Sequence, residues 1–170
     1  SFKGLARAFV DLAETGSIQS GGSTITMQVA KNYFLSSQRT FSRKFTEILL
    51  AQNIEHALSK QEILELYVNK IYLGQRAYGI GAAAEVYYSK NVNQLSLAEI
   101  AMIAGLPKAP SKYNPVVNPK RAIERRDWIL GRMLNLDYIK QAAYEQAIAE
   151  GTGIQYRATV DEVKAPYLAE

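Results

Sequence analysis

The segment Gly21-Gly22-Ser23-Thr24-Ile25-Thr26-Met27-Gln28 opens the part of the sequence that decides both fold and chemistry. From there to Glu47 the chain contains no aspartate or glutamate, although basic residues continue to occur. The cations in this acid-free stretch are Lys31, Arg39, Arg43 and Lys44. Free backbone N–H groups at a helix start, hydroxyl side chains and nearby cations together predict a site for a strongly anionic ligand.

A plainer interpretation fits the same residues. Ser23 and Thr24 are good N-cap residues, and a Gly-Gly pair commonly precedes a helix. Basic residues spread over such a segment often form only a solvated helix face. The residues alone therefore leave two alternatives open, an anion site and a capped basic helix.

The composition is that of a globular domain. The 170 residues are 48% hydrophobic and 21% charged, which is enough to bury a core in about one domain. The absence of cysteine excludes disulfides and thiolate metal sites. A net charge of +4 favours anionic partners such as phospholipid, pyrophosphate or nucleic acid, without choosing among them. No apolar run is long enough to span a bilayer, so any membrane anchor is expected outside these residues.

The apolar periodicity predicts a mainly α-helical chain. Helices are expected over residues 2–13, 24–34, 39–58, 60–69, 82–88, 97–104, 119–134 and 140–150. Ser59 with Glu62 and Ser96 with Glu99 have the spacing of capping boxes. Gly105 suits the C′ position after its helix. Proline-rich residues 107–119 predict a loop, and residues 151–170 predict a linker or the start of a following domain.

Four motifs carry a resemblance to a known family. Residues 21–28 with the following Lys31-Asn32 resemble the second motif of the peptidoglycan glycosyltransferases, the glycan-polymerising domains of class A penicillin-binding proteins. The family usually has Gln where this chain has Met27. Arg43-Lys44 with Glu47 is similar to the third motif, residues 60–74 to the fourth and residues 104–115 to the fifth. The run of residues 75–84 is most similar to the 1A type of Gram-negative bacteria.

The first family motif, Glu-Asp-x-x-Phe-x-x-His-x-Gly, has no match in these residues. Its Glu is taken as the catalytic base of the family, and residues 4–8 resemble the segment just after it. We therefore expect an N-terminally incomplete, lysozyme-like helical glycosyltransferase domain over residues 1–150. A positioned base contributes about a hundred- to ten-thousandfold to a rate, so we expect these residues alone to polymerise poorly.

The resemblance implies roles for individual residues. Glu47 matches the second functional carboxylate and is the catalytic candidate. The residues that match substrate-binding positions are Ser23, Thr24, Gln28, Lys31, Asn32, Arg39, Arg43, Lys44 and Lys108. A departing diphosphate explains why so many cations are needed, since donors fixed in advance stabilise its developing charge.

The implied reaction polymerises lipid II into glycan strands by inverting transfer, with polyprenyl diphosphate as leaving group. Expected partners are lipid II, the growing glycan, a membrane surface and a penicillin-binding transpeptidase domain C-terminal in the same protein; nucleic acid is not expected. No tightly bound cofactor is expected, and Mg²⁺ or Mn²⁺ would accompany the substrate diphosphate. The expected location is the periplasmic face of the bacterial inner membrane, with a transmembrane anchor outside this chain.

Two other classes of protein remain open from the sequence. A lysozyme-like enzyme would cleave glycan with a pair of carboxylates across the sugar. A non-catalytic helical module would dock on anionic lipid through the face formed by residues 31–44, where Tyr33 and Phe34 either dip into the membrane or pack in the core. No Ser-x-x-Lys occurs, so penicillin-acylating chemistry is excluded from this chain. His56, the single histidine, is expected on a helix surface.

Overall fold

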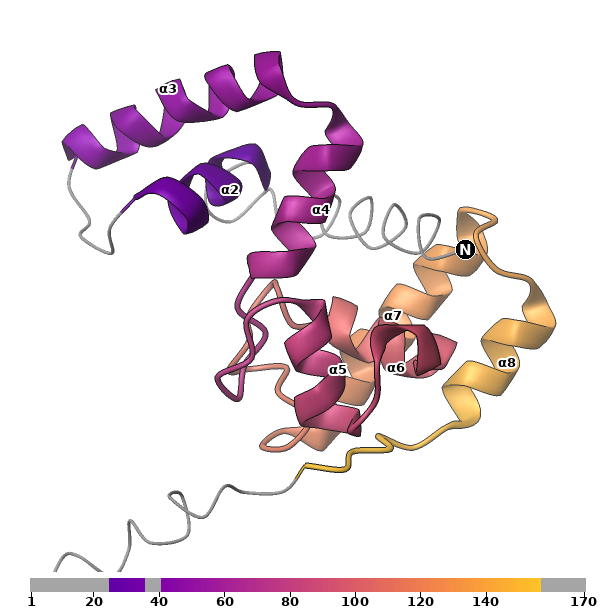
Figure 1. The fold of residues 1–170 in the computed structure, drawn as a ribbon. Coiled ribbons are helices and arrows are strands. Elements are labelled where there is room, and N and C mark those ends of the chain that lie inside the picture. Colours follow the sequence, from indigo (N-terminus) through magenta and orange to yellow (C-terminus); the bar gives the residue numbers. More distant parts are fainter. Residues whose placement is uncertain (1–24, 36–40, 157–170) are drawn as a thin grey trace, which may run out of the picture.

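The computed structural model describes residues 25–35 and 41–156, with the helix backbone alone for residues 41–43. Within these ranges the chain is helical, with one isolated bridge and no longer strand (Figure 1). The elements are α2 (Ile25–Phe34), α3 (Phe41–Ala57), α4 (Lys60–Lys70), α5 (Ile80–Tyr88), the 3-10 helix η1 (Val92–Gln94), α6 (Leu97–Ala104), α7 (Pro119–Asn135) and α8 (Gln141–Ala149). The predicted mainly α fold is confirmed. The helix expected over residues 2–13 lies outside the described residues.

Helix α4 connects the two parts of the described structure (Figure 1). At one end α2 packs against both α3 and α4, while at the other α6 packs against α7 and α7 against α8. One hydrophobic core runs through the connection, because Val29 of α2, Tyr67 of α4 and Ala83 of α5 belong to the same buried cluster. A smaller cluster joins α6, α7 and α8 around Leu130. The position of α3 therefore depends on α2 and α4.

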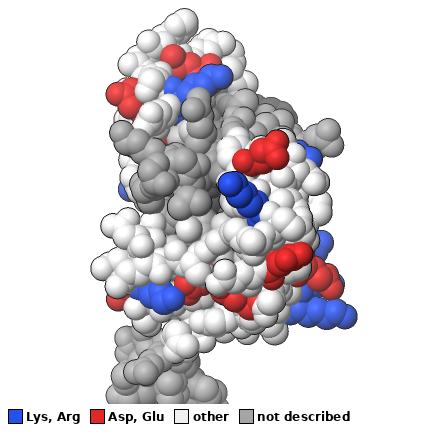
Figure 2. Space-filling view, turned by 90° about the vertical axis from the view of Figure 1, so that its right-hand side faces the viewer, with Lys and Arg blue, Asp and Glu red and all other residues white. Residues whose placement is uncertain are grey.

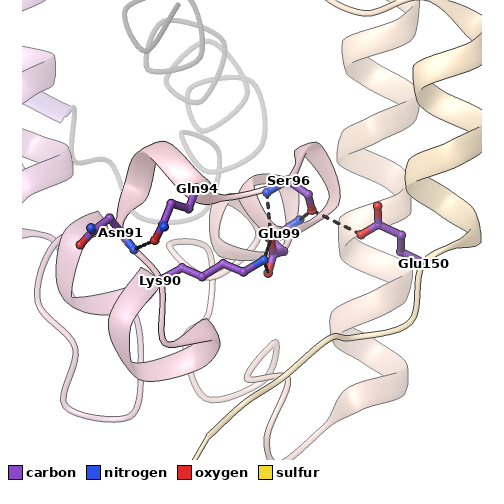
Figure 3. Close-up of polar contacts among 6 residues, drawn as sticks. All are labelled: Lys90, Asn91, Gln94, Ser96, Glu99 and Glu150. Carbon is purple, nitrogen blue, oxygen red and sulfur yellow. Dashed lines mark hydrogen bonds and ion pairs between the residues drawn. The ribbon is translucent and has the colours of Figure 1, made fainter.

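Both predicted capping boxes are confirmed. At α4 the Ser59 hydroxyl accepts from the Glu62 N–H at 3.2 Å, and Glu62 accepts from the Ser59 N–H at 2.8 Å. At α6 the pair Ser96 and Glu99 repeats this exchange at 3.2 and 2.8 Å. There Lys90 also donates to both oxygens of Glu99, at 2.8 and 3.1 Å (Figure 3). Local spacing determined both helix starts, as the rule for such boxes requires.

The role predicted for Gly105 is wrong. A glycine at C′ adopts a left-handed backbone, but Gly105 is the C-cap of α6 with φ −75° and ψ −19°, which is right-handed. A Cβ at this position would lie 2.9 Å from Cγ of Arg125 on α7. The glycine is needed because two helices approach closely here, and a close approach between distant residues leaves no local signature.

A buried arginine closes the end of α8. Arg126 of α7 is buried, and its guanidinium donates to the backbone carbonyls of Glu150 at 2.9 Å and Gly151 at 3.0 Å. Its Nη2 lies 2.9 Å from the carboxylate of the half-exposed Asp127. The last carbonyls of a helix lack partners within the helix, so Arg126 supplies donors that the backbone cannot. Residues 150–151 are thereby held against α7.

Candidate functional site

Helix α3 buries a carboxylate and exposes several apolar side chains. Glu47 is buried with 6% of its surface exposed, and Ala51, one turn later, is buried beside it. By contrast, Phe45 is 64% exposed, and Ile48 and Leu49 are exposed as well. Amphipathic helices ordinarily bury the apolar stripe and leave carboxylates in water. The reversed arrangement makes Glu47 the strongest functional candidate among the described residues.

Within residues 25–35 and 44–156, the Glu47 carboxylate has little compensation for its burial. Among the described residues its contact is with Lys44, whose Nζ lies 3.4 Å from Oε1, at the long limit for a hydrogen bond. Lys44 is itself half-exposed and precedes Glu47 by one helical turn. A buried carboxylate costs free energy unless it is closely paired. Glu47, a buried carboxylate with one long contact among the described residues, is therefore a functional candidate on its geometry.

Helix α2 contributes polar residues next to α3. Its buried residues include Ile25, Val29 and Ala30, which anchor it to the rest of the molecule. Gln28 and Asn32 are half-buried and lie four residues apart, hence on one face of the helix. Lys31 is exposed in the last turn, where the helix dipole favours a cation. Since α2 packs against α3, two of the predicted cations, Lys31 and Lys44, lie on neighbouring helices.

The remaining predicted residues are not brought together by the described geometry. Ser23, Thr24 and Arg39 lie outside the described residues, and of Arg43 only the helix backbone is described. Lys108 is exposed in the turn that follows α6, outside the packed pair of α2 and α3. A single cation site that contains all of these residues therefore stays a prediction.

The surface and the helices of the described residues bear on whether the chain could bind a polyanion, hold a metal ion or cross a membrane. On the face in Figure 2, the described Lys and Arg side chains alternate with Asp and Glu instead of forming one broad basic patch. No group of three or more His, Asp or Glu within residues 25–35 and 41–156 could hold a metal ion. His56 is exposed on α3, as predicted. Over the same residues, no helix is both long and apolar enough to cross a membrane.

Sequence reasoning missed one aromatic residue that the fold places in contact with a motif residue. Tyr78 pairs with Tyr72 across the isolated antiparallel bridge, with ring centroids 5.0 Å apart. Both rings are exposed. The buried–exposed alternation of Ile71, Tyr72 and Leu73 is visible only in the structure, because all three residues are hydrophobic in the sequence.

Known proteins are similar to this chain in sequence. The model of the family described as Transglycosylase matches residues 1–134. Penicillin-binding protein 1A of Pseudomonas aeruginosa is 64% identical over 168 residues, covering 99% of this chain and 20% of that protein. Penicillin-binding protein 1A of Neisseria gonorrhoeae is 55% identical over 167 residues, covering 98% of this chain and 21% of that protein.

A solved structure is also similar. The crystal structure of penicillin-binding protein 1A from Haemophilus influenzae matches with a TM-score of 0.57 and 37% identity, covering 85% of this chain and 18% of that chain. The chain thus spans about a fifth of the length of the curated relatives that it matches. A family match over residues 1–134, together with close relatives over nearly the whole chain, shows that this chain belongs to the transglycosylase family.

Proposed function

We propose that this chain is the glycosyltransferase domain of a peptidoglycan-polymerising penicillin-binding protein, with residues 1–150 as the domain and 151–170 leading to the next. The donor is a glycan strand on polyprenyl diphosphate, and the acceptor is lipid II. Membership of the transglycosylase family and 64% identity to a penicillin-binding protein 1A support this class of reaction. The observation that carries the proposal is the buried Glu47 beside Lys44.

The leaving group explains the charges around Glu47. When the acceptor sugar hydroxyl attacks the donor's anomeric carbon, the bond to the diphosphate oxygen breaks and negative charge grows on the diphosphate. Lys31 and Lys44, on packed helices, are suited to receive that charge without reorganising. Arg39, Arg43 and Lys108 are proposed to join them.

Glu47 is proposed to hold the cations in position while the leaving group departs. Its carboxylate lies 3.4 Å from the Lys44 ammonium group, so loss of the negative charge would release that group. Gln28 and Asn32 offer hydrogen bonds to sugar or phosphate from the half-buried face of α2, and Ser23 and Thr24 are proposed to add hydroxyl donors. The proton acceptor for the attacking hydroxyl is not assigned to any residue of this chain.

A divalent ion, Mg²⁺ or Mn²⁺, is proposed to enter with the substrate diphosphate. Phosphate oxygens are favoured ligands of such ions, which are commonly held by substrate phosphates with only one or two carboxylates. The described residues offer no cluster that would hold the ion independently of the substrate. We propose no tightly bound cofactor and no nucleic-acid partner.

The exposed apolar side of α3 supports a position at a membrane surface. Phe45, Ile48 and Leu49 form this side, and Phe34 at the end of α2 is also exposed. A polyprenyl-linked substrate is confined to the membrane, so an exposed apolar side on the helix that carries Glu47 would keep this helix at the lipid surface. We propose the periplasmic face of the bacterial inner membrane, a membrane anchor outside these residues, and a C-terminal transpeptidase domain in the longer protein.

Glycan cleavage is less well supported. Hydrolysis of the lysozyme type needs two carboxylates across the sugar, one on each side of the bond. Glu47 and Glu99 are the buried carboxylates among the described residues. Glu99 is occupied by Lys90 and by the Ser96 N–H at the start of α6. It is therefore a structural residue and not the partner that a hydrolase would require.

The proposed function is tested with the variant Glu47→Gln in the full-length protein. Polymerisation of purified lipid II is measured at saturating substrate, and the rate is expected to fall about a hundred- to thousandfold. The matched control is Glu55→Gln, an exposed glutamate on the same helix, which should keep the normal rate. A normal rate in Glu47→Gln would show that the ion pair of Glu47 with Lys44 has no catalytic role.

A further inference from the structure

The reversal between α4 and α5, residues 71–79, presents two aromatic rings to solvent. Tyr72 is 42% exposed and Tyr78 is 63% exposed. They face each other across the antiparallel bridge, with ring centroids 5.0 Å apart and ring planes at 44°. Directly opposed residues of an antiparallel pair lie on the same side. The two rings, called here the tyrosine pair, therefore form one exposed aromatic surface.

The rings of the tyrosine pair are not part of the main hydrophobic cluster. Ile71, Leu73 and Ala77 are buried in the main hydrophobic cluster and supply the packing of the reversal. The tyrosine pair lies on the exposed side, where polar residues would serve folding equally well. Adjacent exposed aromatic rings of this kind commonly mark a binding surface.

The reversal has a rigid and strained backbone. Gln75 and Arg76 have φ of 47° and 58°, left-handed values that residues with a side chain rarely adopt. The Ala77 N–H donates to the Gly74 carbonyl at 2.8 Å, and the buried Tyr87 hydroxyl donates to the Leu73 carbonyl at 2.7 Å. Strain held in place by such contacts is concentrated at functional sites. The tyrosine pair is thus fixed before any ligand binds, which lowers the entropic cost of binding.

The reversal lies next to the proline-rich loop. A Cβ at Gly74 would lie 3.5 Å from both the Pro110 carbonyl and the side-chain nitrogen of Asn114. In Figure 1 the loop between α4 and α5 accordingly lies beside the loop that precedes α7. That loop carries the exposed Lys108. The backbone of the reversal is therefore packed against a segment that the proposed function already uses.

The separation of the tyrosine pair from Glu47 indicates what kind of ligand the pair would bind. Glu47 lies on α3, and the reversal and α3 lie at opposite ends of α4 (Figure 1), a helix of 11 residues that is itself roughly 16 Å long at 1.5 Å per residue. A diphosphate bound beside Glu47 does not extend that far, whereas a chain of sugars does. Tyrosine offers a flat apolar ring and a hydroxyl at its edge. These match the apolar C–H face and polar rim of a sugar ring.

We propose that the tyrosine pair binds sugar rings of the glycan strand, away from the reacting bond. The inference rests on the proposed function, because it takes the glycan as the substrate class. Held at this second point, a strand stays associated while successive units are added. The tyrosine pair is a binding surface and does not act on the bond that forms.

The test measures sugar binding directly. Oligomers of β-1,4-linked N-acetylglucosamine of increasing length are titrated into the full-length protein by calorimetry. Affinity is expected to rise with oligomer length, and the double variant Tyr72→Ala/Tyr78→Ala should raise Kd about tenfold. The matched control is Tyr138→Ala, an equally exposed tyrosine outside the reversal, which should leave Kd unchanged.

A second variant separates binding from folding. Tyr78→Ser removes only the more exposed ring, so it should fold normally and still weaken binding. Unchanged Kd in folded Tyr78→Ser and in the double variant would overturn the inference and leave the rings as a brace for the reversal. The two proposals fail separately. Normal polymerisation by Glu47→Gln refutes the catalytic proposal, whereas unchanged oligomer binding by the tyrosine variants refutes only the binding surface.

Discussion

Two buried glutamates, Glu47 on α3 and Glu99 on α6, differ in what surrounds their carboxylates. Glu99 accepts from Lys90 at 2.8 and 3.1 Å and from the Ser96 N–H at 2.8 Å. Glu47 has a lysine at 3.4 Å among the described residues. A carboxylate with close donors repays its desolvation and stabilises the fold, whereas one with a single long contact does not. Within the part of the chain that the structure describes, the two buried acids thus differ in their hydrogen bonding and not in their burial.

The largest expected effect separates catalysis from stability at Glu47. Glu47→Gln should lower the polymerisation rate about a hundred- to thousandfold, with no loss in the free energy of unfolding, because the substitution removes a poorly compensated buried charge. The measurement combines lipid II turnover with urea unfolding of the same preparation. A large decrease in the free energy of unfolding of Glu47→Gln would show that Glu47 stabilises the fold, as Glu99 does.

A large effect on stability is expected at Arg126. Arg126→Leu leaves the carbonyls at the end of α8 without donors, which should lower the free energy of unfolding by about 2–4 kcal/mol. Arg121→Leu, an exposed arginine on the same helix, should change it by less than about 0.5 kcal/mol. Urea denaturation of both variants makes the comparison, and equal effects would show that the buried guanidinium is not needed.

The two capping boxes provide a smaller, matched contrast. Glu99→Ala loses the cap and the ion pair with Lys90, which should cost about 2 kcal/mol. Glu62→Ala loses a solvent-exposed cap of the same geometry and should cost about 0.5–1 kcal/mol. Thermal unfolding ranks the two variants. A larger loss at Glu62 would mean that the lysine adds nothing to the α6 cap.

The smallest effect on stability is expected on the outer side of α3. Phe45→Gln should change the free energy of unfolding by less than about 0.5 kcal/mol, since the ring is 64% exposed. It should nevertheless weaken binding of the full-length protein to phospholipid vesicles, measured by flotation beside the unsubstituted protein. Val117→Gln, with 65% exposure in the loop before α7, is the matched control and should bind normally. Strong destabilisation by Phe45→Gln would show that this side is packed.

Short-range features of the fold could be predicted from the sequence. The capping boxes at Ser59 and Ser96 span three residues each, and the structure has both. Within the described residues, the predicted helices agree with the structure to within a few residues, because apolar periodicity is also local. The role predicted for Gly105 is wrong, because the residue that requires a glycine there, Arg125, lies on α7, twenty residues later. The sequence did not predict the pairing of Tyr72 with Tyr78, because this contact joins residues on the two sides of a turn.

The sequence by itself determined the helical class, the helix starts and the motifs that place the chain in the transglycosylase family. Phe45, Ile48 and Leu49 have the three- and four-residue spacing of one stripe of a helix. Only the tertiary structure decided that this stripe points outward while Glu47 is buried. The physical reason is that periodicity reports which residues share a face, whereas burial depends on the elements packed against it, and those elements come from elsewhere in the chain.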